Sequence, residues 1–307
     1  MQDSIERRQQ LPATTGLARL DQAVASLFPE YSRARLQAWI KSGELRVNGQ
    51  LCKPKDKVGP GAWIEINAQM PTVSVGPEKI TLEVCYEDES VLVVNKPAGL
   101  VVHPGAGNPS GTLMNAVLHH APETEGLPRA GIIHRLDKDT TGLLMIGKTI
   151  TAMTNLSRQL AQRTIKREYE ALVYGVPPGV GVVDAAIGRH PKQRTKKAVL
   201  SDGRSAETRF WVLSVFAGLS HLRFELVTGR THQIRVHMEH IGHPIVGDPV
   251  YRARRGSPIE GLPDIGRQAL HARRLGFIHP ASSRALTFEA PPPEDFNNLL
   301  AWAKTLG

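Results

Sequence analysis

The chain has 307 residues, a formal net charge of +9, 41% hydrophobic and 22% charged residues, and two cysteines. This length exceeds what one small core usually serves, so we expect one large and one small globular domain. No apolar run approaches the roughly 18 residues of a membrane span, and the N-terminus lacks the apolar core of a signal peptide. Cys52 and Cys85 are too far apart to suggest a disulfide framework. We therefore expect a cytoplasmic protein with no membrane contact, and the positive charge favours an acidic partner such as nucleic acid.

The first 70 residues show the pattern of a small helical module with a hairpin. Apolar residues recur at helical spacing from Leu20 to Leu27 and again over 36–40, and Gly43 marks the end of the second helix. Residues 45–47 alternate as a strand before Asn48-Gly49, which is a strong hairpin signal, and residues 63–66 predict the closing strand. We therefore expect two short helices packed on a small sheet.

This module resembles the S4 RNA-binding domain. The matching residues are Arg19-Leu20-Asp21, Ser32-Arg33-Ala34, Ile40 with Gly43, and Val47-Asn48-Gly49. In that family the two helices present basic side chains to structured RNA, so the resemblance implies RNA binding by such side chains here. The expected RNA-binding residues are Arg33, Arg35, Lys41 and Arg46. A generic helical adaptor is the alternative interpretation of the same helices.

A stretch rich in Pro, Gly, Thr and Ser separates this module from the rest of the chain and predicts a linker. We expect an N-terminal tail over 1–16, the S4-like α/β domain over 17–70, the linker over 71–79 and one large domain over 80–307. In the large domain strand patterns outnumber helical ones. The strands are expected at 91–94, 143–146, 169–173, 208–212 and 222–227, and the helices at 113–120, 153–163 and 233–241. The fold class is therefore α+β, with a large, mixed but mostly antiparallel sheet.

A run from Gly131 to Leu144 places one acid, Asp137, between a basic dipeptide and a Thr-Thr-Gly turn. The residues that follow, 143–146, are apolar and predict a buried strand. A carboxylate beside a core strand is costly to leave unpartnered, so it needs a charged partner or a chemical task. Asp137 is therefore the residue that most needs a functional explanation.

The large domain resembles the RluA family of pseudouridine synthases, and six separate stretches carry the resemblance. They are 94–104, His134-Arg135-Leu136-Asp137 with 140–142, 166–171, 228–237, Gly247-Asp248-Pro249 and 268–272. The resemblance implies the pseudouridine synthase fold and the isomerisation of uridine to pseudouridine within RNA. The loop over 105–111 and the segment Arg194-Thr195-Lys196 favour the branch that acts on large-subunit ribosomal RNA. The implied partner is therefore 23S ribosomal RNA, free or in a pre-50S particle, and the implied target is the loop of helix 69.

Three residues receive catalytic roles from this resemblance. Asp137 is expected to act as nucleophile or base near C1′ and C2′ of the target uridine, and the residues leave that choice open. Arg230, in a Gly-Arg-Thr turn, is expected to form the ion pair that keeps Asp137 ionised. Tyr169 is expected to stack on the target base and to serve the late proton transfer at C5. Without the resemblance, a strand tyrosine would be assigned to the core and a loop arginine to the surface.

Reaching C1′ inside folded RNA requires the nucleotide to be flipped out of its stack. Arg135 is either the wedge or phosphate clamp for that step or a surface ion-pair partner of Asp139. Asp139 would share a face with Asp137 in an extended segment, but the family pattern requires the acid directly after Leu136. The expected substrate-binding residues are His134, Arg135, Leu136, Thr140, Leu226, Gln233, Arg235 and His237.

The implied reaction is redox-neutral, so no cofactor is expected. The histidines at 232, 237, 240 and 243 have no neighbouring cysteine or acidic pair in a familiar ligand pattern, so we predict no metal site. A monomer is the expected oligomeric state. Two other classes remain open. A non-catalytic RNA-binding assembly factor would not need Asp137, Tyr169 and Arg230 together, and a metal-dependent RNA hydrolase would need paired carboxylates.

Overall fold

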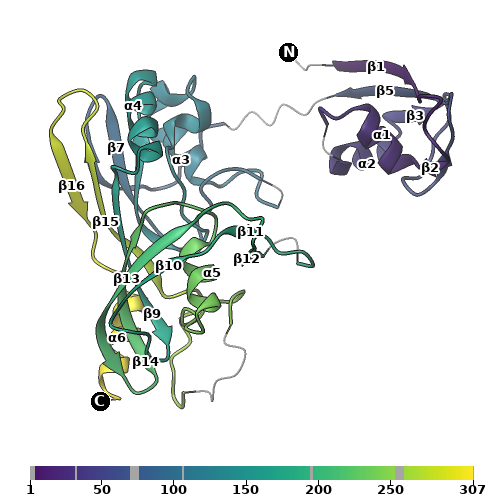
Figure 1. Ribbon diagram of the computed structural model, residues 1–307. Helices are drawn as coiled ribbons and strands as arrows, with labels where there is room; N and C mark the ends of the chain where they lie inside the picture. Colours follow the sequence, from purple (N-terminus) through teal and green to yellow (C-terminus); the bar gives the residue numbers. More distant parts are fainter. Residues whose placement is uncertain are drawn as a thin grey trace. The chain divides into compact units, whose positions relative to one another are not determined.

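The computed structural model describes residues 4–31, 33–69, 76–105, 107–193, 196–252 and 259–306. The chain divides into two compact units, Met1–Ser74 and Val75–Gly307 (Figure 1). This division follows the predicted order of a small domain before a large one. Most of the predicted linker, and Ser32 of the S4-like pattern, lie outside the described residues, so the finer boundaries at 16/17, 70/71 and 79/80 stay a prediction.

The N-terminal unit contains two helices and two small sheets. Its elements are β1 (Ser4–Gln10), β2 (Ala18–Arg19), α1 (Leu20–Leu27), α2 (Arg33–Ser42), β3 (Leu45–Val47), β4 (Lys57–Val58) and β5 (Trp63–Gln69). Strands β1, β5 and β3 form one antiparallel sheet, and β2 pairs with β4. Apolar side chains of both helices and of the three-stranded sheet share one core that includes Val24, Leu36, Ile40, Leu45 and Ile64. The predicted helices and hairpin are therefore present.

The predicted N-terminal tail is partly a strand. Residues Ser4–Gln10 pair along β5 in antiparallel register, from Ser4 opposite Gln69 to Gln10 opposite Trp63. The segment 6–10 is exposed, so its sequence carries no alternation of apolar and polar residues that would predict a strand. Side-chain contacts reinforce the pairing, because the Arg8 guanidinium lies 4.6 Å from the centre of the Trp63 ring.

The second unit is built on a nine-stranded sheet. Its strand order is β10-β13-β14-β9-β15-β8-β7-β6, with β16 paired to β15. The strands are β6 (Glu83–Glu87), β7 (Val91–Lys96), β8 (Thr141–Gly147), β9 (Lys166–Tyr174), β10 (Val180–Asp184), β13 (Glu207–Phe216), β14 (Leu219–Leu226), β15 (Leu270–Ile278) and β16 (Ala285–Glu289). Only the β15–β8 pair is parallel among these described strands. The α+β class and the mostly antiparallel mixed sheet are thus confirmed.

Helices cover both faces of the sheet near β7 and β8. The helices of this unit are α3 (Leu113–His120), α4 (Ile150–Ala161), α5 (Gln233–His240) and α6 (Glu294–Lys304), and a small hairpin is formed by β11 (Ile187–Arg189) and β12 (Lys197–Val199). Leu92 and Leu144 pack with Val117 of α3, whereas Val93 and Met145 pack with Leu156 of α4. Because both faces are covered, β8 is buried throughout its length, as its apolar sequence predicted.

Residues 76–79, the end of the predicted linker, belong to the second unit. The Glu78 backbone N–H donates to the carbonyl of Asn115, and the Asn115 side-chain amide donates to the carbonyl of Gly76. Asn115 also completes a reciprocal cap with Thr112 at the start of α3.

Across the described residues of both units, none of the helices has the length and apolar content that crossing a bilayer requires.

Candidate active site

A cavity of about 900 Å³ opens beside the segment that joins α3 to β8. Most of its lining comes from five segments: residues around His103, the stretch 129–140, the end of α4, the start of β9, and the stretch 226–235. Met114 of α3 and Leu270 of β15 complete it. Among the described lining residues Asp137 is the one acid, and it stands among six arginines. Those arginines are Arg129, Arg135, Arg163, Arg167, Arg230 and Arg235. Such a cavity attracts a polyanion and directs it to a single carboxylate.

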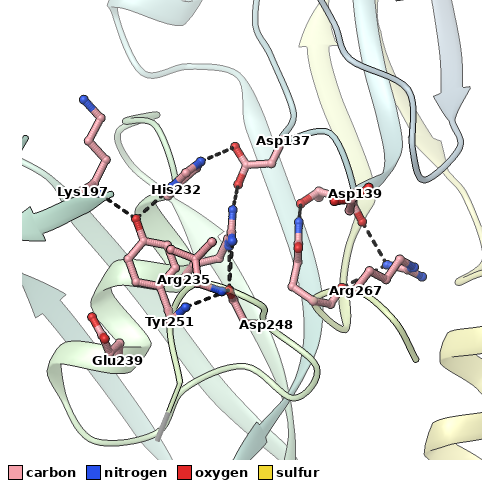
Figure 2. Close-up of polar contacts among 12 residues, drawn as sticks. Asp137, Asp139, Lys197, His232, Arg235, Glu239, Asp248, Tyr251 and Arg267 are labelled. Atoms are coloured by element: carbon pink, nitrogen blue, oxygen red, sulfur yellow. Dashed lines mark hydrogen bonds and ion pairs between the residues drawn. The ribbon is translucent and has the colours of Figure 1, made fainter. Parts of the chain in front are cut away.

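The loop that carries Asp137 is held from the protein interior. Lys96, which is 1% exposed, donates its ammonium hydrogens to the carbonyls of Lys138, Pro97 and Leu100. Burial lowers the pKa of Lys96 to about 8, and the negative charges of Asp139 and Asp137 oppose that shift. Arg267 donates to the Asp139 carbonyl (Figure 2). The loop backbone is therefore fixed at two consecutive carbonyls.

The carboxylate of Asp137 is ion-paired with Arg235 from the first turn of α5. The Arg235 Nη1 lies 2.9 Å from Asp137 Oδ2. The remaining donors of the guanidinium are engaged by Asp248, with distances of 2.6 Å for Nε and 2.9 Å for Nη2 (Figure 2). Because Asp248 holds the guanidinium in a bidentate pair, Arg235 can orient only one oxygen of Asp137. Asp137 Oδ1 accepts no hydrogen bond from the described residues, and His232 Nε2 lies 3.8 Å from it.

The prediction that Arg230 forms this ion pair is wrong. Arg230 Nε instead donates to the backbone carbonyl of Ser205 at 3.1 Å, and the side chain is exposed. The two arginines are five residues apart, and only the second lies on α5, which runs beside the Asp137 loop. Arg230 still lines the cavity, at its rim. The sequence motif contained both arginines, but it carried no information about which one reaches Asp137.

Tyr169 lies in β9 and lines the cavity as predicted. Its side chain is 5% exposed, and burial raises the pKa of the phenol; the charge of Arg167 opposes this shift and that of Asp137 adds to it. The phenol therefore stays protonated at neutral pH. Arg167, two residues earlier, is also buried and donates to the Leu226 carbonyl, and it was not predicted as a site residue.

Most of the predicted substrate-binding residues reach the cavity. His134 is neutral there, because burial and the charge of Arg167 lower its pKa to about 3, and its Nε2 accepts from the Met145 backbone N–H. Arg135 is exposed at the mouth of the cavity. The full set of these lining residues is His134, Arg135, Leu136, Thr140, Leu226, Gln233 and Arg235.

Two of the predicted substrate-binding residues have internal partners instead. His237 is fully buried and does not line the cavity: its Nδ1 contacts the Thr208 hydroxyl and its Nε2 contacts the Ala185 carbonyl. The prediction for His237 is therefore wrong. Gln233 lines the cavity, but its Oε1 accepts from the Arg230 N–H and the Thr228 hydroxyl while its Nε2 donates to the Glu207 carbonyl. Gln233 shapes the turn at 228–233, which leaves its amide no free partner for RNA.

Sequence reasoning missed several lining residues. His103 has a buried Nε2 without a hydrogen-bond partner among the described residues, and burial together with Arg129 and Arg135 lowers its pKa to about 4. Arg129 sits in a left-handed backbone conformation with φ of 57°. Both belong to segments outside the predicted elements, so hydrophobic periodicity gave no signal for them.

Among the described residues we find no group of three His, Cys, Asp or Glu side chains able to hold a metal ion.

In the N-terminal unit, a buried acid organises the predicted RNA-binding helix. Asp21 is fully buried and accepts hydrogen bonds from Arg33, Arg19 and Gln37. Burial alone would raise the pKa of Asp21, but these hydrogen bonds lower it well below the usual range. Lys41 and Arg46 are exposed, with Arg46 bonded to the Gly43 carbonyl. Arg35 also has an interaction partner. The predicted basic surface is therefore present around α2, partly anchored by Asp21.

Comparison with known proteins identifies the family. Residues 90–240 match the model of the RNA pseudouridylate synthase family, and residues 18–64 match the S4 domain. The chain is 50% identical over 309 residues to the ribosomal large subunit pseudouridine synthase D of Pseudomonas aeruginosa, covering 98% of this chain and 97% of that protein. This chain belongs to the RNA pseudouridylate synthase family. The resemblance seen in the sequence motifs is thus confirmed, and the protein is an RNA pseudouridine synthase.

Further relatives of this RNA pseudouridylate synthase agree. The protein of the same name from Escherichia coli (strain K12) is 48% identical over 291 residues, which is 92% of this chain and 89% of that one. Among solved structures, Human RNA Pseudouridylate Synthase Domain Containing 4 is 25% identical with a TM-score of 0.58 and covers 72% of this chain and 93% of its own length. Human RNA Pseudouridylate Synthase Domain Containing 1 is 27% identical with a TM-score of 0.54.

Proposed function

We propose that this synthase converts specific uridines of large-subunit ribosomal RNA into pseudouridine, with Asp137 as its catalytic carboxylate. The observation that supports this role is the isolation of Asp137 as the one acid among the described residues that line the cavity. One of its oxygens is bound by Arg235, whereas Oδ1 accepts no hydrogen bond from the described residues and is the open oxygen of the carboxylate. A carboxylate held in this way is oriented by one oxygen and can react through the other.

In the isomerisation, the glycosidic bond between C1′ and N1 breaks, the uracil turns, and a bond forms between C1′ and C5. The C5 proton is then lost, and N1 takes up a proton in its place. A nucleophilic attack on the sugar, a nucleophilic attack on the base and the removal of a sugar proton would each use the open oxygen of Asp137. Burial keeps the phenol of Tyr169 protonated. Its ring would stack on the uracil, and its hydroxyl would serve the late proton transfer at C5. Arg235, rather than the predicted Arg230, would hold Asp137 in its orientation.

The target uridine must leave its stack to reach Asp137. Arg135 is exposed at the cavity mouth, two residues before the carboxylate, and would enter the position that the base vacates or clamp the flanking phosphate. Arg129, Arg163 and Arg230, which line the same cavity, would hold the RNA backbone. Leu136 and Leu226, on either side of the site, would contact the flipped base.

The substrate assignment rests on the relatives, which carry the name ribosomal large subunit pseudouridine synthase D. We infer 23S ribosomal RNA as the substrate, with the loop of helix 69 as target and either free RNA or a pre-50S particle as its form. The S4 unit, with Arg33, Arg35, Lys41 and Arg46, would bind structured RNA through phosphate contacts. We further infer that the enzyme works as a monomer in the cytoplasm. Mapping pseudouridines in ribosomal RNA from a deletion strain tests the target directly.

Tritium release from 5-³H-uridine in 23S ribosomal RNA, without added metal, tests the catalytic assignment. Asp137→Asn should abolish release, because the variant side chain can neither attack nor accept a proton. Asp139→Asn is the matched control, since it changes an acid two residues away whose backbone carbonyl, rather than side chain, anchors the loop. Release by Asp137→Asn at the wild-type rate would refute the assignment. Loss of wild-type release on adding a chelator would favour a metal-dependent enzyme.

A further inference from the structure

Two hydrogen bonds link the protein interior to His232, and the far side of this ring lies beside the open oxygen of Asp137. The Lys197 backbone N–H in β12 contacts the Tyr251 hydroxyl oxygen at 2.9 Å, and that hydroxyl contacts His232 Nδ1, also at 2.9 Å. On the other side of the imidazole, His232 Nε2 lies 3.8 Å from Asp137 Oδ1 (Figure 2). None of these three groups received a role in the reaction from the sequence motifs.

The partners of the Tyr251 hydroxyl determine which nitrogen of His232 carries hydrogen. The amide N–H of Lys197 can only donate, so the phenol oxygen accepts that bond. Tyr251 is fully buried, so its own hydrogen needs an acceptor, and His232 Nδ1 is the acceptor in contact. If Nδ1 carried hydrogen, the phenol would receive two donors and its hydrogen would be buried without a partner. Nδ1 is therefore the acceptor, and Nε2 carries the hydrogen that faces Asp137.

Both rings are held firmly in place. The guanidinium of Arg235 lies 5.0 Å from the centre of the Tyr251 ring, and the Lys196 ammonium lies 4.9 Å from it. Lys196, which directly precedes β12, is also ion-paired with Glu239 of α5. This ion pair links β12 to the helix that carries Arg235. His232 has φ of 59°, a conformation that costs energy for a residue other than glycine. This backbone geometry aims the imidazole at Asp137.

Burial keeps the His232 ring neutral. Burial lowers its pKa, Asp137 and Asp248 oppose that shift, and Arg235 and Arg135 add to it. A neutral ring with hydrogen on Nε2 offers a single N–H to the open oxygen of Asp137. A ring with hydrogen on Nδ1 would instead present a lone pair to the carboxylate, which would repel it.

We propose that Tyr251 fixes His232 as the Nε2–H tautomer, and that this N–H makes His232 a positioning residue for the catalytic carboxylate. Arg235 then holds Asp137 Oδ2 and His232 orients Oδ1 from the opposite side. The two anchors together define the carboxylate plane, which one ion pair through a single oxygen leaves free to rotate. This inference rests on the proposed role of Asp137 and extends it to a second layer of two side chains.

The tautomer is tested directly by NMR of the full-length protein carrying ¹⁵N-labelled histidine, with the His232 signals assigned through His232→Asn. The wild-type ring should show hydrogen on Nε2 and a bare Nδ1. Tyr251→Phe should give a mixture of tautomers, because the donor to Nδ1 is lost while the ring that packs on Arg235 remains. Hydrogen on Nδ1 in the wild type, or an unchanged tautomer in Tyr251→Phe, would overturn the proposal.

Single-turnover rates and RNA affinities test the positioning role. Tyr251→Phe and His232→Asn should each lower the rate constant by about 10-fold, less than the roughly 100-fold that a 1 Å misplacement can cost, with RNA affinity unchanged. Asparagine suits position 232 because it tolerates positive φ. The double variant should be no slower than the slower single variant, since both changes break one chain. Tyr86→Phe is the matched control: it removes a phenol hydroxyl bonded to Asp88, away from the cavity, and should leave the rate unchanged.

The outcomes separate this inference from the proposed function. Losses that multiply in the double variant, or a wild-type rate in Tyr251→Phe, would show that the chain does not act as one unit and would refute the positioning role. Neither result would touch the catalytic role of Asp137, which Asp137→Asn tests alone. Tritium release by Asp137→Asn would instead refute the proposed function, while the tautomer measured by NMR would still stand or fall on its own.

Discussion

In the candidate active site, Asp248 holds the guanidinium of Arg235 in position beside Asp137. Asp248 is buried and binds the Arg235 guanidinium through both of its oxygens, so Arg235 meets Asp137 with its one remaining terminal nitrogen. Asp248 also accepts from the backbone N–H groups of Val250 and Tyr251, which fixes its own position. The geometry around Asp137 is therefore set by a chain of charge-assisted hydrogen bonds that ends in the backbone.

Substitution of the two arginines separates their roles. Arg235→Lys should lower the rate of pseudouridine formation by about 100-fold, because lysine cannot hold Asp248 through a fork and Asp137 at the same time. Arg230→Ala should retain a rate within a factor of about 10 and lose RNA affinity instead, since an exposed cavity arginine contributes phosphate contacts. Single-turnover kinetics at saturating RNA, with circular dichroism to check folding, provide the measurement. Equal rate losses in both variants would contradict this division.

Among the secondary-structure elements, the parallel pairing of β8 with β15 positions the loop that carries Asp137. Gly142 pairs with Ala272 in the parallel register, and its φ is 114°. A Cβ at this position would lie 2.2 Å from the Ala272 carbonyl oxygen, so the two backbones can approach only where the side chain is absent. Asp137 lies five residues before this contact. The close approach therefore sets where the loop leaves the sheet.

Gly142→Ala should destabilise the protein by about 3 kcal/mol, because positive φ and a backbone clash both oppose the methyl group. Gly99→Ala is the control: Gly99 also has positive φ, 81°, but open space around its would-be Cβ. It should cost only about 1 kcal/mol. Urea denaturation of the second unit, monitored by tryptophan fluorescence, measures the free energy of unfolding of both variants. If Gly142→Ala lowered the free energy of unfolding no more than Gly99→Ala does, the two backbones could move apart without penalty and this explanation would be wrong.

The start of α1 in the N-terminal unit should respond to acid. Asp21 has a pKa below its usual range in the folded protein, owing to hydrogen bonds from Arg33, Arg19 and Gln37 that outweigh burial. A group with a depressed folded pKa stabilises the fold above its unfolded pKa, about 4, and that contribution is lost as the pH falls further. Asp21→Asn should therefore cost the unit about 2 kcal/mol at pH 7. Thermal unfolding from pH 7 to pH 3 should show this difference shrinking below about pH 4; a constant difference would refute the assignment.

On the scale of the whole molecule, the two compact units differ in what they contain. The unit Met1–Ser74 has its own core, and the described residues that line the cavity all belong to the unit Val75–Gly307. Both carry basic surface, in keeping with the net charge of +9. Binding of a long RNA by two linked surfaces is tighter than binding by either one, and neutralising phosphates makes it sensitive to salt.

Deletion of residues 1–74 should leave the second unit folded and weaken binding to 23S ribosomal RNA by about 10-fold or more at physiological salt. The affinity of the shortened protein should also depend less steeply on salt, because fewer phosphates are neutralised. Filter binding across a salt series, together with the melting temperature of each protein, gives both quantities. Unfolding of the shortened chain would contradict the independence of the two units.

The sequence by itself determined much of the element pattern and singled out Asp137. The predicted helix 113–120 coincides with α3, and the predicted strand 143–146 lies within β8, because local apolar periodicity directly reflects which face is buried. Asp137 was found because an acid beside a buried strand violates that pattern. The strand β1 was missed because an exposed edge strand carries no such periodicity.

Only the tertiary structure decided which groups meet at the site. Arg235 and Asp137 are 98 residues apart in the chain, and their contact depends on where α5 lies, on Asp248 holding the guanidinium, and on the loop being anchored by Lys96 and Arg267. Sequence motifs specify which residue types are available, whereas distances of a few ångströms between distant segments follow from the packing of the entire unit. For that reason the motif around 228–237 pointed to Arg230 and His237, and the fold placed Arg235 beside the carboxylate.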